Sequence, residues 1–286
     1  MENKIDISVI IPMYNSAKYI EETIASIVLQ APHHLKYEII IVDDVSKDNS
    51  REVVKNLNNE NIRLIELEKN GGTANARNTG IRLARGEWIQ FVDSDDKICN
   101  DLYAKFETFQ KPDINCYVFS VLVENYDHNL MRTISKVKDK RAFGYFYTIW
   151  NKFIRKEICI DFVHVSRQNE DVCFIFDMMN AHELKIALIP DAYYIYNCKN
   201  EQSKMANFKK NEYRNMYAYV YSQINKSDDL TKMFFLETFV GIVFSKGMPF
   251  FMSLGIGIKT LFRLFKFLPK VYSNGIRNCI SNTKIG

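Results

Sequence analysis

The first hundred residues alternate between short apolar runs rich in β-branched residues and longer segments with apolar residues at helical spacing. Four runs have the length of a buried strand: 7–12, 37–42, 62–67 and 88–92. Three segments between them have helical spacing: 16–27, 48–57 and 73–84. We expect Ser16 to cap the first helix and Pro12 to end the first strand. Strands and helices in alternation predict an α/β fold, in which a parallel sheet is covered on both faces.

Polar residues follow the expected strands at the points where ligands bind in such sheets, beyond the carboxyl ends of the strands. The four tips read P-M-Y-N (12–15), D-D-V-S (43–46), E-K-N-G-G (68–72) and D-S-D-D (93–96). Acidic side chains gathered at one edge repel one another unless a cation lies among them. Carboxylate oxygens suit Mg²⁺ or Mn²⁺, which are commonly shared with the phosphates of a substrate. For any one tip, an acidic turn or a helix cap is the alternative.

The glycine pair at 71–72 precedes an expected helix, so its amides are candidates for a phosphate site. Arg77 falls in the first turns of that helix. Its guanidinium could meet a phosphate, or it could hold the acidic tips together by bidentate bonding. The residues alone leave both roles open.

Taken in order, V-I-I-P-M-Y-N, I-I-V-D-D-V-S-K-D, N-G-G-T-A-N-A-R-N-T-G and F-V-D-S-D-D resemble the N-terminal half of a family 2 glycosyltransferase of GT-A fold. The resemblance is dense from Ile7 to about Asp101 and thins afterwards. It implies a Rossmann-like, mostly parallel sheet flanked by helices, and an inverting sugar transferase of the bacterial polysaccharide type. It also implies a nucleotide-sugar donor, most simply a UDP-sugar, and Mn²⁺ or Mg²⁺ as cofactor.

Residues that match the family's motifs are expected to hold the donor and the metal. The expected donor-binding residues are Pro12, Tyr14, Asn15, Asp43, Asp44, Asn70, Gly71, Arg77, Asp93 and Ser94. The resemblance places Asp95 on the metal that bridges the two phosphates, with Asp96 as a nearby alternate ligand. Val45 departs from the family, which often has a small or polar residue at this position.

Downstream, Q-N-E-D (168–171) precedes an apolar helical run and matches the family's acidic pair under the acceptor pocket. By that match Asp171 is the expected catalytic base. The alternative is a purely structural role, in which the acidic pair caps a helix. The resemblance puts Trp150, Lys152 and Glu170 on the acceptor side. Tyr193, Tyr194 and Tyr196 form an expected strand, followed by Asn197 where the family often has arginine and by a loop that Ser203 closes.

The C-terminal part differs in composition from the rest, so we expect a catalytic domain over 1–205 and a helical extension over 206–286. All 34 acidic residues lie at or before Glu237, and seven basic residues follow it. The basic and apolar segment 261–268 suits a membrane interface, although packing on protein is the alternative. Lys246, Pro249 and Lys259 interrupt the apolar run, which argues against a spanning helix. No nucleic-acid module is recognisable, so no nucleic-acid partner is expected.

The first residues lack the apolar core of a secretory signal, and the six cysteines form no C-x-x-C pair. We therefore expect a cytoplasmic protein at the inner face of the membrane. The expected function is transfer of a sugar from a nucleotide diphosphate to a hydroxyl of a glycan or lipid-linked glycan during surface polysaccharide synthesis. Alternatives are an inactive sugar-nucleotide-binding partner and a nucleotidyltransferase. The oligomeric state is not predicted.

Overall fold

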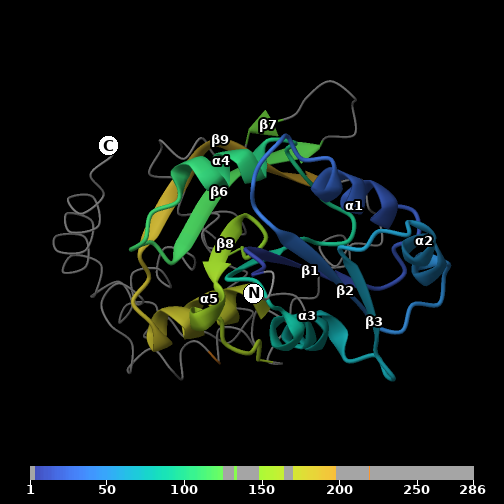
Figure 1. Ribbon diagram of the computed structural model, residues 1–286. Coiled ribbons are helices and arrows are strands. Elements are labelled where there is room, and N and C mark those ends of the chain that lie inside the picture. The colour runs from blue at the N-terminus through green and yellow to red at the C-terminus, as the bar shows by residue number, and fades with distance from the viewer. Residues whose placement is uncertain (1–3, 125–131, 134–147, 164–169, 198–218, 220–286) are drawn as a thin grey trace.

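The computed structural model describes residues 4–124, 132–133, 148–163, 170–197 and 219 (Figure 1). Its strands are β1 Ile7–Met13, β2 Tyr37–Asp43, β3 Ile62–Glu66, β4 Trp88–Phe91, β5 Lys97–Ile98, β6 Cys116–Glu124, β7 Arg132–Thr133, β8 Lys152–Arg155 and β9 Ile186–Asn197. Its α-helices are α1 Ile20–Val28, α2 Ser50–Asn56, α3 Gly72–Leu83, α4 Leu102–Phe109 and α5 Glu170–Ala181, with a 3-10 turn at Lys156–Ile158.

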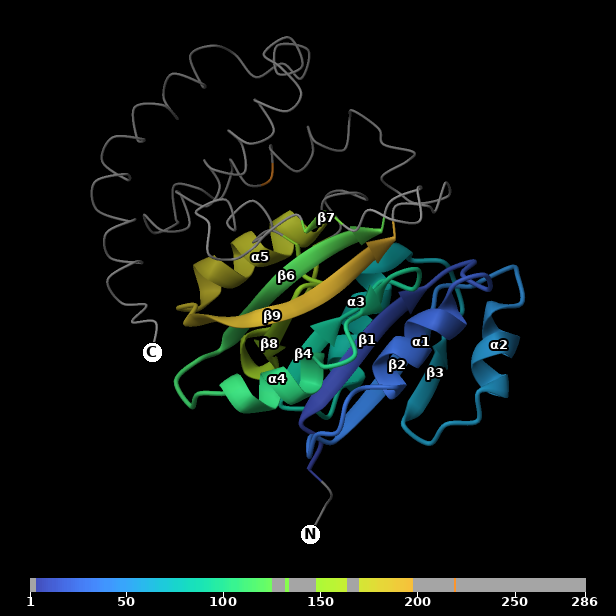
Figure 2. The ribbon, with the colours of Figure 1, turned by 90° about the horizontal axis from the view of Figure 1, so that it is seen from above.

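The strands of the described chain form one sheet in the order β3-β2-β1-β4-β8-β6-β9-β5, and β7 pairs with β6. Strands β1 to β4 are mutually parallel, as the alternating sequence predicts. Beyond β4 the sheet changes direction, because β8 runs antiparallel to both β4 and β6. Strands β6 and β9 are parallel and run side by side (Figure 2). The sheet therefore joins a parallel half to a mixed half at β4.

Helices cover the two faces of this sheet (Figure 1). Helix α3 packs on β1 and β2, and α5 lies on the same side of the sheet. Helices α1 and α4 lie on the other side, and α2 packs beside α1. The α/β class and the helix-covered sheet expected from the sequence are confirmed.

Two local expectations at the end of β1 are wrong. The strand continues through Pro12 to Met13, paired with β2. Proline is tolerated there because the pairing of β1 with β4 ends at Ile10, so no ladder partner needs the missing N–H. Ser16 does not cap α1: the helix begins at Ile20 after a turn, and its N-cap residue Tyr19 makes no side-chain cap. The Ser16 hydroxyl instead contacts Ser94 at 2.6 Å.

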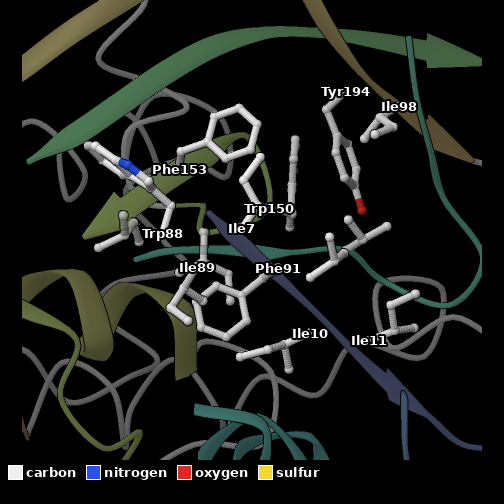
Figure 3. Packing of buried hydrophobic residues seen from close by; sticks show 14 of the residues in the cluster. Ile7, Ile10, Ile11, Trp88, Ile89, Phe91, Ile98, Trp150, Phe153 and Tyr194 are labelled. Carbon is white, nitrogen blue, oxygen red and sulfur yellow. The ribbon is translucent and has the colours of Figure 1, made fainter. Parts of the chain in front are cut away.

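The core fills the space between the strands and α5, α3 and α4, and aromatic rings dominate it at β4 and β8. Figure 3 shows Trp88, Phe91, Phe153, Trp150 and Tyr194 among the isoleucines of β1. These rings make edge and stacked contacts with neighbouring rings at centroid separations of 4.0–6.1 Å. This packing fixes β4, from whose end the acidic loop leaves the sheet.

The expected extension at 206–286, its basic segment and the Ser203 loop fall outside the described residues, except for Tyr219. Within the described part of the chain, no helix has both the length and the apolar character needed to cross a membrane. Cys99, Cys116, Cys159 and Cys173 are free thiols.

Candidate active site

The loops that follow β1, β2, β3 and β4 meet at one edge of the sheet and are tied together by side chains. The Asn15 amide donates to Ser46 Oγ at 2.9 Å, which joins the first tip to the second. The Ser16 and Ser94 hydroxyls join the first tip to the fourth. The Thr23 hydroxyl of α1 also donates to the carbonyl of Ser94 at 3.2 Å. The structure thus brings the predicted tips into one cluster.

The second and third tips are joined by Asp44. Its two carboxylate oxygens accept hydrogen bonds from the amides of Gly71 and Gly72, at 2.7 and 2.8 Å. The Asn70 side chain donates to the Asp44 carbonyl at 2.8 Å. The expectation of open amides for a phosphate at this helix start is therefore wrong, because a protein carboxylate already occupies them. Gly72 has φ +81°, which explains the glycine at that position.

The remaining expected donor residues divide into buried and exposed groups. Pro12 is buried in β1, and Asp43 accepts the Ser46 amide with both carboxylate oxygens. Tyr14 and Asn15 are exposed, and Asn15 Oδ1 accepts the Lys47 amide at 2.8 Å. Tyr14 thus offers the freely accessible ring at this edge, while the carboxylates of Asp43 and Asp44 shape the loops.

Val45, the departure from the family pattern, has φ +66°. The left-handed region costs an L-residue roughly 1–2 kcal/mol, and a β-branched residue is a clear outlier there. We expect Val45→Gly to stabilise the protein by about 0.5–1 kcal/mol, since the relief of strain exceeds the entropic cost of glycine. Urea unfolding midpoints measure this. Val45→Thr keeps the branched carbon and should not raise the stability. A loss of stability in Val45→Gly would show that the packing of the Val45 side chain outweighs its backbone strain.

Residues of β9 hold the D-S-D-D loop (93–96) by hydrogen bonds. The Tyr194 hydroxyl donates to Asp96 Oδ2 at 2.7 Å and accepts the Asp93 amide at 3.0 Å. The Asn197 amide donates to Asp96 Oδ1 at 2.7 Å. Figure 3 shows the Tyr194 ring stacked against Trp150. Burial, with the charges of Asp95 and Asp93, raises the pKa of the Asp96 carboxyl. Asp96 therefore points into the fold, and the alternate metal role expected for it does not fit this placement.

Asp95 is the carboxylate of this loop that lines a cavity of about 230 Å³, together with side chains at and just before the start of α1, Lys97 and Asn197. The described residues contain no group of three or more histidine, cysteine or acidic side chains that would hold a metal alone. One protein carboxylate at a cavity fits Mn²⁺ or Mg²⁺ of the kind completed by substrate phosphates and water. The residues therefore fit a shared metal at Asp95 rather than a closed metal cage.

Arg77 joins the acidic loop to α5. Its Nη2 lies 2.8 Å from Asp93 Oδ1, and its Nη1 lies 2.7 Å from Asp171 Oδ1 and 3.6 Å from Glu170 Oε1. The Arg77 side chain is 4% exposed. Although burial opposes the charge, Asp171, Asp93 and Glu170 raise the pKa of Arg77. Of the two roles left open by the sequence, the structure shows the bridge between acids.

The structure buries all three residues that were expected on the acceptor side, which does not fit direct contact with an acceptor. Trp150 stacks on Tyr194 and Tyr196, Glu170 is buried beside Arg77, and Lys152 is fully buried. Lys152 Nζ donates to the Thr148 carbonyl and, at 2.8 Å, to Asn151 Oδ1. The motif places Lys152 on its strand but does not say whether its side chain faces a substrate or the core.

Burial lowers the pKa of Lys152 to about 7, against opposing effects of Cys116 and Asp171. An unfolded lysine titrates near about 10.4, so between these values the unfolded chain binds a proton that the folded chain lacks. This group therefore makes stability rise with pH across that window, by up to about 1.4 kcal/mol per pH unit. We expect Lys152→Met to remove this part of the slope, measured by urea unfolding between pH 7 and 10. Lys69→Met, at an exposed position, should keep it; equal slopes in all three proteins would contradict the shift.

Three supporting residues were not given a role by the sequence. Tyr194 holds the acidic loop, Thr23 holds Ser94, and Asn78 clasps Phe162 by donating to its carbonyl at 3.0 Å and accepting its amide at 2.6 Å. Asn78 lies beside Arg77 in N-A-R-N, so its place in that motif was the available signal. The contacts of Thr23 and Tyr194 span more than 70 residues of chain, which no local pattern reveals.

A parallel half-sheet joined to a mixed half, with an acidic loop at the junction, defines the GT-A class of fold. The TarS fragment 1–349 from S. aureus, solved with UDP-GlcNAc, matches with a TM-score of 0.70 and 23% identity, over 93% of this chain and 80% of that one. A mannosyltransferase from Pyrobaculum calidifontis, solved with GDP-Man and Mn²⁺, matches with a TM-score of 0.58 and 15% identity, over 96% and 88%.

The chain belongs to glycosyl transferase family 2, whose sequence profile matches residues 8–169. Glycosyltransferase GlyG of Streptococcus pneumoniae is 33% identical over 168 residues, which are 58% of this chain and 50% of GlyG. The putative teichuronic acid biosynthesis glycosyltransferase TuaG of Bacillus subtilis is 42% identical over 101 residues, which are 35% of this chain and 39% of TuaG. The chain thus matches half or less of these relatives.

Proposed function

We propose that the protein is an inverting, metal-dependent glycosyltransferase that moves a sugar from a nucleotide diphosphate donor to a hydroxyl of a glycan or lipid-linked glycan. The observation that carries this proposal is the Arg77 bridge. It ties Asp93, in the acidic loop that bears Asp95, to Asp171 on a different element 78 residues further along the chain. The bridge joins the loop that carries Asp95, the carboxylate at the cavity, to the helix that carries Asp171. Direct sugar transfer needs a metal-binding carboxylate and a general base in one site.

In this proposal Asp171 takes the proton of the acceptor hydroxyl as its oxygen forms a bond to the anomeric carbon of the sugar. The bond from that carbon to the diphosphate oxygen breaks, and the nucleoside diphosphate leaves with the electron pair. Arg77 fixes the Asp171 carboxylate by its 2.7 Å hydrogen bond. The Asp171 side chain is 20% exposed, so the carboxylate remains within reach of an acceptor.

Asp95 would hold the metal, and Tyr194 and Thr23 would keep its loop in position. A divalent cation there supplies positive charge to the departing diphosphate. The exposed ring of Tyr14, 46% exposed, is placed to stack on a nucleotide base. Asp44 and Asn70 would brace the loops around the nucleoside, because the Asp44 carboxylate accepts the Gly71 and Gly72 amides and its carbonyl accepts the Asn70 side chain.

The relatives support the choice of donor, metal and acceptor. TarS was solved with UDP-GlcNAc, and the Pyrobaculum mannosyltransferase with GDP-Man and Mn²⁺. The name of TuaG refers to teichuronic acid biosynthesis. We therefore propose a UDP-sugar as donor, Mn²⁺ or Mg²⁺ as cofactor, and a cell-surface polysaccharide or its lipid-linked precursor as acceptor.

The full chain should be stabilised by its donor in a manner that requires the metal. A panel of nucleotide sugars is screened by thermal shift with Mn²⁺ or with a chelator, since a ligand of the folded state raises the midpoint with the logarithm of its concentration. Asp95→Asn should raise the Mn²⁺ concentration that the donor needs. Asp191→Asn, at an exposed aspartate of β9, is the matched control. Equal donor stabilisation with and without metal would contradict the shared site.

Turnover distinguishes this activity from its alternatives. A glycosyltransferase releases nucleoside diphosphate in the presence of acceptor, whereas a nucleotidyltransferase would release pyrophosphate. Donor binding without product, across donors and acceptors of the proposed classes, would identify a sugar-nucleotide-binding partner instead.

A further inference from the structure

Helix α5 is buried on two opposite sides, and the core of the described fold accounts for one of them. The residues on the core side are Phe174, Ile175, Met178 and Met179. At 3.6 residues per turn, Cys173 and Phe176 point away from that side. Both are nevertheless 0% exposed, and Val172 beside them is also buried, although none of the three belongs to the core cluster. We call Val172, Cys173, Phe176 and Asp177 the outer face of α5.

A helix that covers a sheet usually carries polar residues on the side away from the sheet. Val172, Cys173 and Phe176 on the outer face of α5 are instead apolar and buried, beside the partly buried Asp177 and the exposed Asn180. Helix α5 lies at the end of the described fold remote from α1 and α2 in both views (Figures 1 and 2). The core cluster therefore does not account for the burial of Val172, Cys173 and Phe176.

Tyr219, the one described residue beyond β9, lies against this face. Its hydroxyl donates a 2.6 Å hydrogen bond to Asp177 Oδ2. Burial and this hydrogen bond raise the pKa of Tyr219, and nearby Cys173 adds to the effect. Burial, followed by the charge of Asp177, also raises the pKa of the Cys173 thiol to about 12. Cys173 is thus fully buried, and the partly buried Asp177 has the Tyr219 hydroxyl as its partner.

The sequence around Tyr219 has the composition that such a face needs. Residues 213–221 read Y-R-N-M-Y-A-Y-V-Y, which is four tyrosines, a methionine and a valine within nine residues. A tyrosine ring buries apolar area while its hydroxyl satisfies a polar partner. Val172 and Phe176 offer the apolar area, and Asp177 offers the acceptor.

We propose that Tyr219 docks on the outer face of α5 and fixes the helix that carries Asp171. Glu170 and Asp171 form the first turn of α5, where they meet Arg77. Tyr219 is then a positioning residue, which holds the helix from behind while Arg77 holds its beginning. The docking itself does not depend on the proposed activity; its consequence for Asp171 does.

Alkylation of cysteines in the full chain tests the docking without any turnover. Iodoacetamide labelling is followed by mass spectrometry at Cys173 and at Cys116, which is buried in the sheet core. We expect Tyr219→Ala to speed labelling of Cys173 by about tenfold or more while Cys116 stays protected, since local opening exposes a covered thiol. Tyr219→Phe keeps the ring and should give a smaller increase. Asn180→Ala, at an exposed position on the same side of α5, should give none.

The proposal is overturned if Cys173 in Tyr219→Ala remains as protected as Cys116. It is also overturned if Cys173 in the wild type becomes reactive on dilution, because a second copy of the chain then covers the face. Protection of Cys173 only in the presence of anionic vesicles would likewise overturn it, because a membrane then covers the face. Labelling of Cys116 in Tyr219→Ala would show that this variant has unfolded. In that case Tyr219→Phe decides, and an unchanged rate of Cys173 labelling in Tyr219→Phe overturns the docking.

The positioning role is tested by kinetics. We expect kcat to fall in Tyr219→Phe while the donor KM is retained. Failure of turnover in the wild type would count against the proposed activity and would leave the labelling result standing.

Discussion

Asp171→Asn is expected to lower kcat by about 10²–10⁴-fold, the usual contribution of a positioned general base. Asparagine has nearly the same shape, and its side-chain oxygen can still accept the Arg77 hydrogen bond that Asp171 Oδ1 accepts at 2.7 Å. It cannot take a proton from an acceptor hydroxyl. The measurement is release of nucleoside diphosphate under saturating donor and acceptor, and the donor KM should change little because Asp171 is not placed among the donor contacts.

The control for this substitution is Asp161→Asn, an aspartate that lies shortly before α5 and is 70% exposed. It should retain wild-type kcat. Thermal unfolding of both variants shows whether the loss of charge next to Arg77 weakens the fold. If Asp171→Asn keeps more than about a tenth of wild-type kcat, Asp171 does not act as the base, since general-base removal costs at least about 10².

The sequence predicts the parallel half of the fold well because its information is local. Strands β1 to β4 are short runs of mainly apolar residues, and the helices between them have apolar residues at helical spacing. The errors fall where a tertiary contact decides the outcome. Ser16 has the chemistry of a helix cap, yet its hydroxyl bonds to Ser94 across 78 residues. The antiparallel entry of β8 beside β4 likewise depends on packing rather than on any local pattern.

Which residues gather at the carboxyl edge could be predicted, because the parallel topology fixes where strand ends meet. What each carboxylate contacts there could not. Asp44 binds the amides of Gly71 and Gly72, and Asp96 turns inward to Tyr194. Lys152 lies on a strand that the sequence links to the acceptor side, but its side chain enters the core. The motifs therefore predict which residues lie at the sheet edge. They do not predict which of these side chains are buried and which can contact a ligand.

Arg77→Met is expected to lower both stability and activity, because Arg77 is the shared cation of three acids. Removing one partner of a buried ion pair typically costs about 3–5 kcal/mol, since the opposite charge is left uncompensated. Here Glu170 is buried and Asp93 and Asp171 are partly buried, so their carboxylates would repel one another. Urea unfolding measures the stability, and nucleoside diphosphate release measures the activity.

Two further variants separate the charge of Arg77 from its geometry. Arg77→Lys keeps a positive charge, but one ammonium cannot replace two guanidinium nitrogens that point at Asp93 and Asp171. It should recover part of the stability and little of the activity. Arg82→Met, on the same helix and 57% exposed, loses a 3.9 Å pair and should change stability by less than about 0.5 kcal/mol. A stable and active Arg77→Met would mean that the donor-side loop and α5 hold their relative positions without the bridge, and the geometric basis of the proposed transfer would be lost.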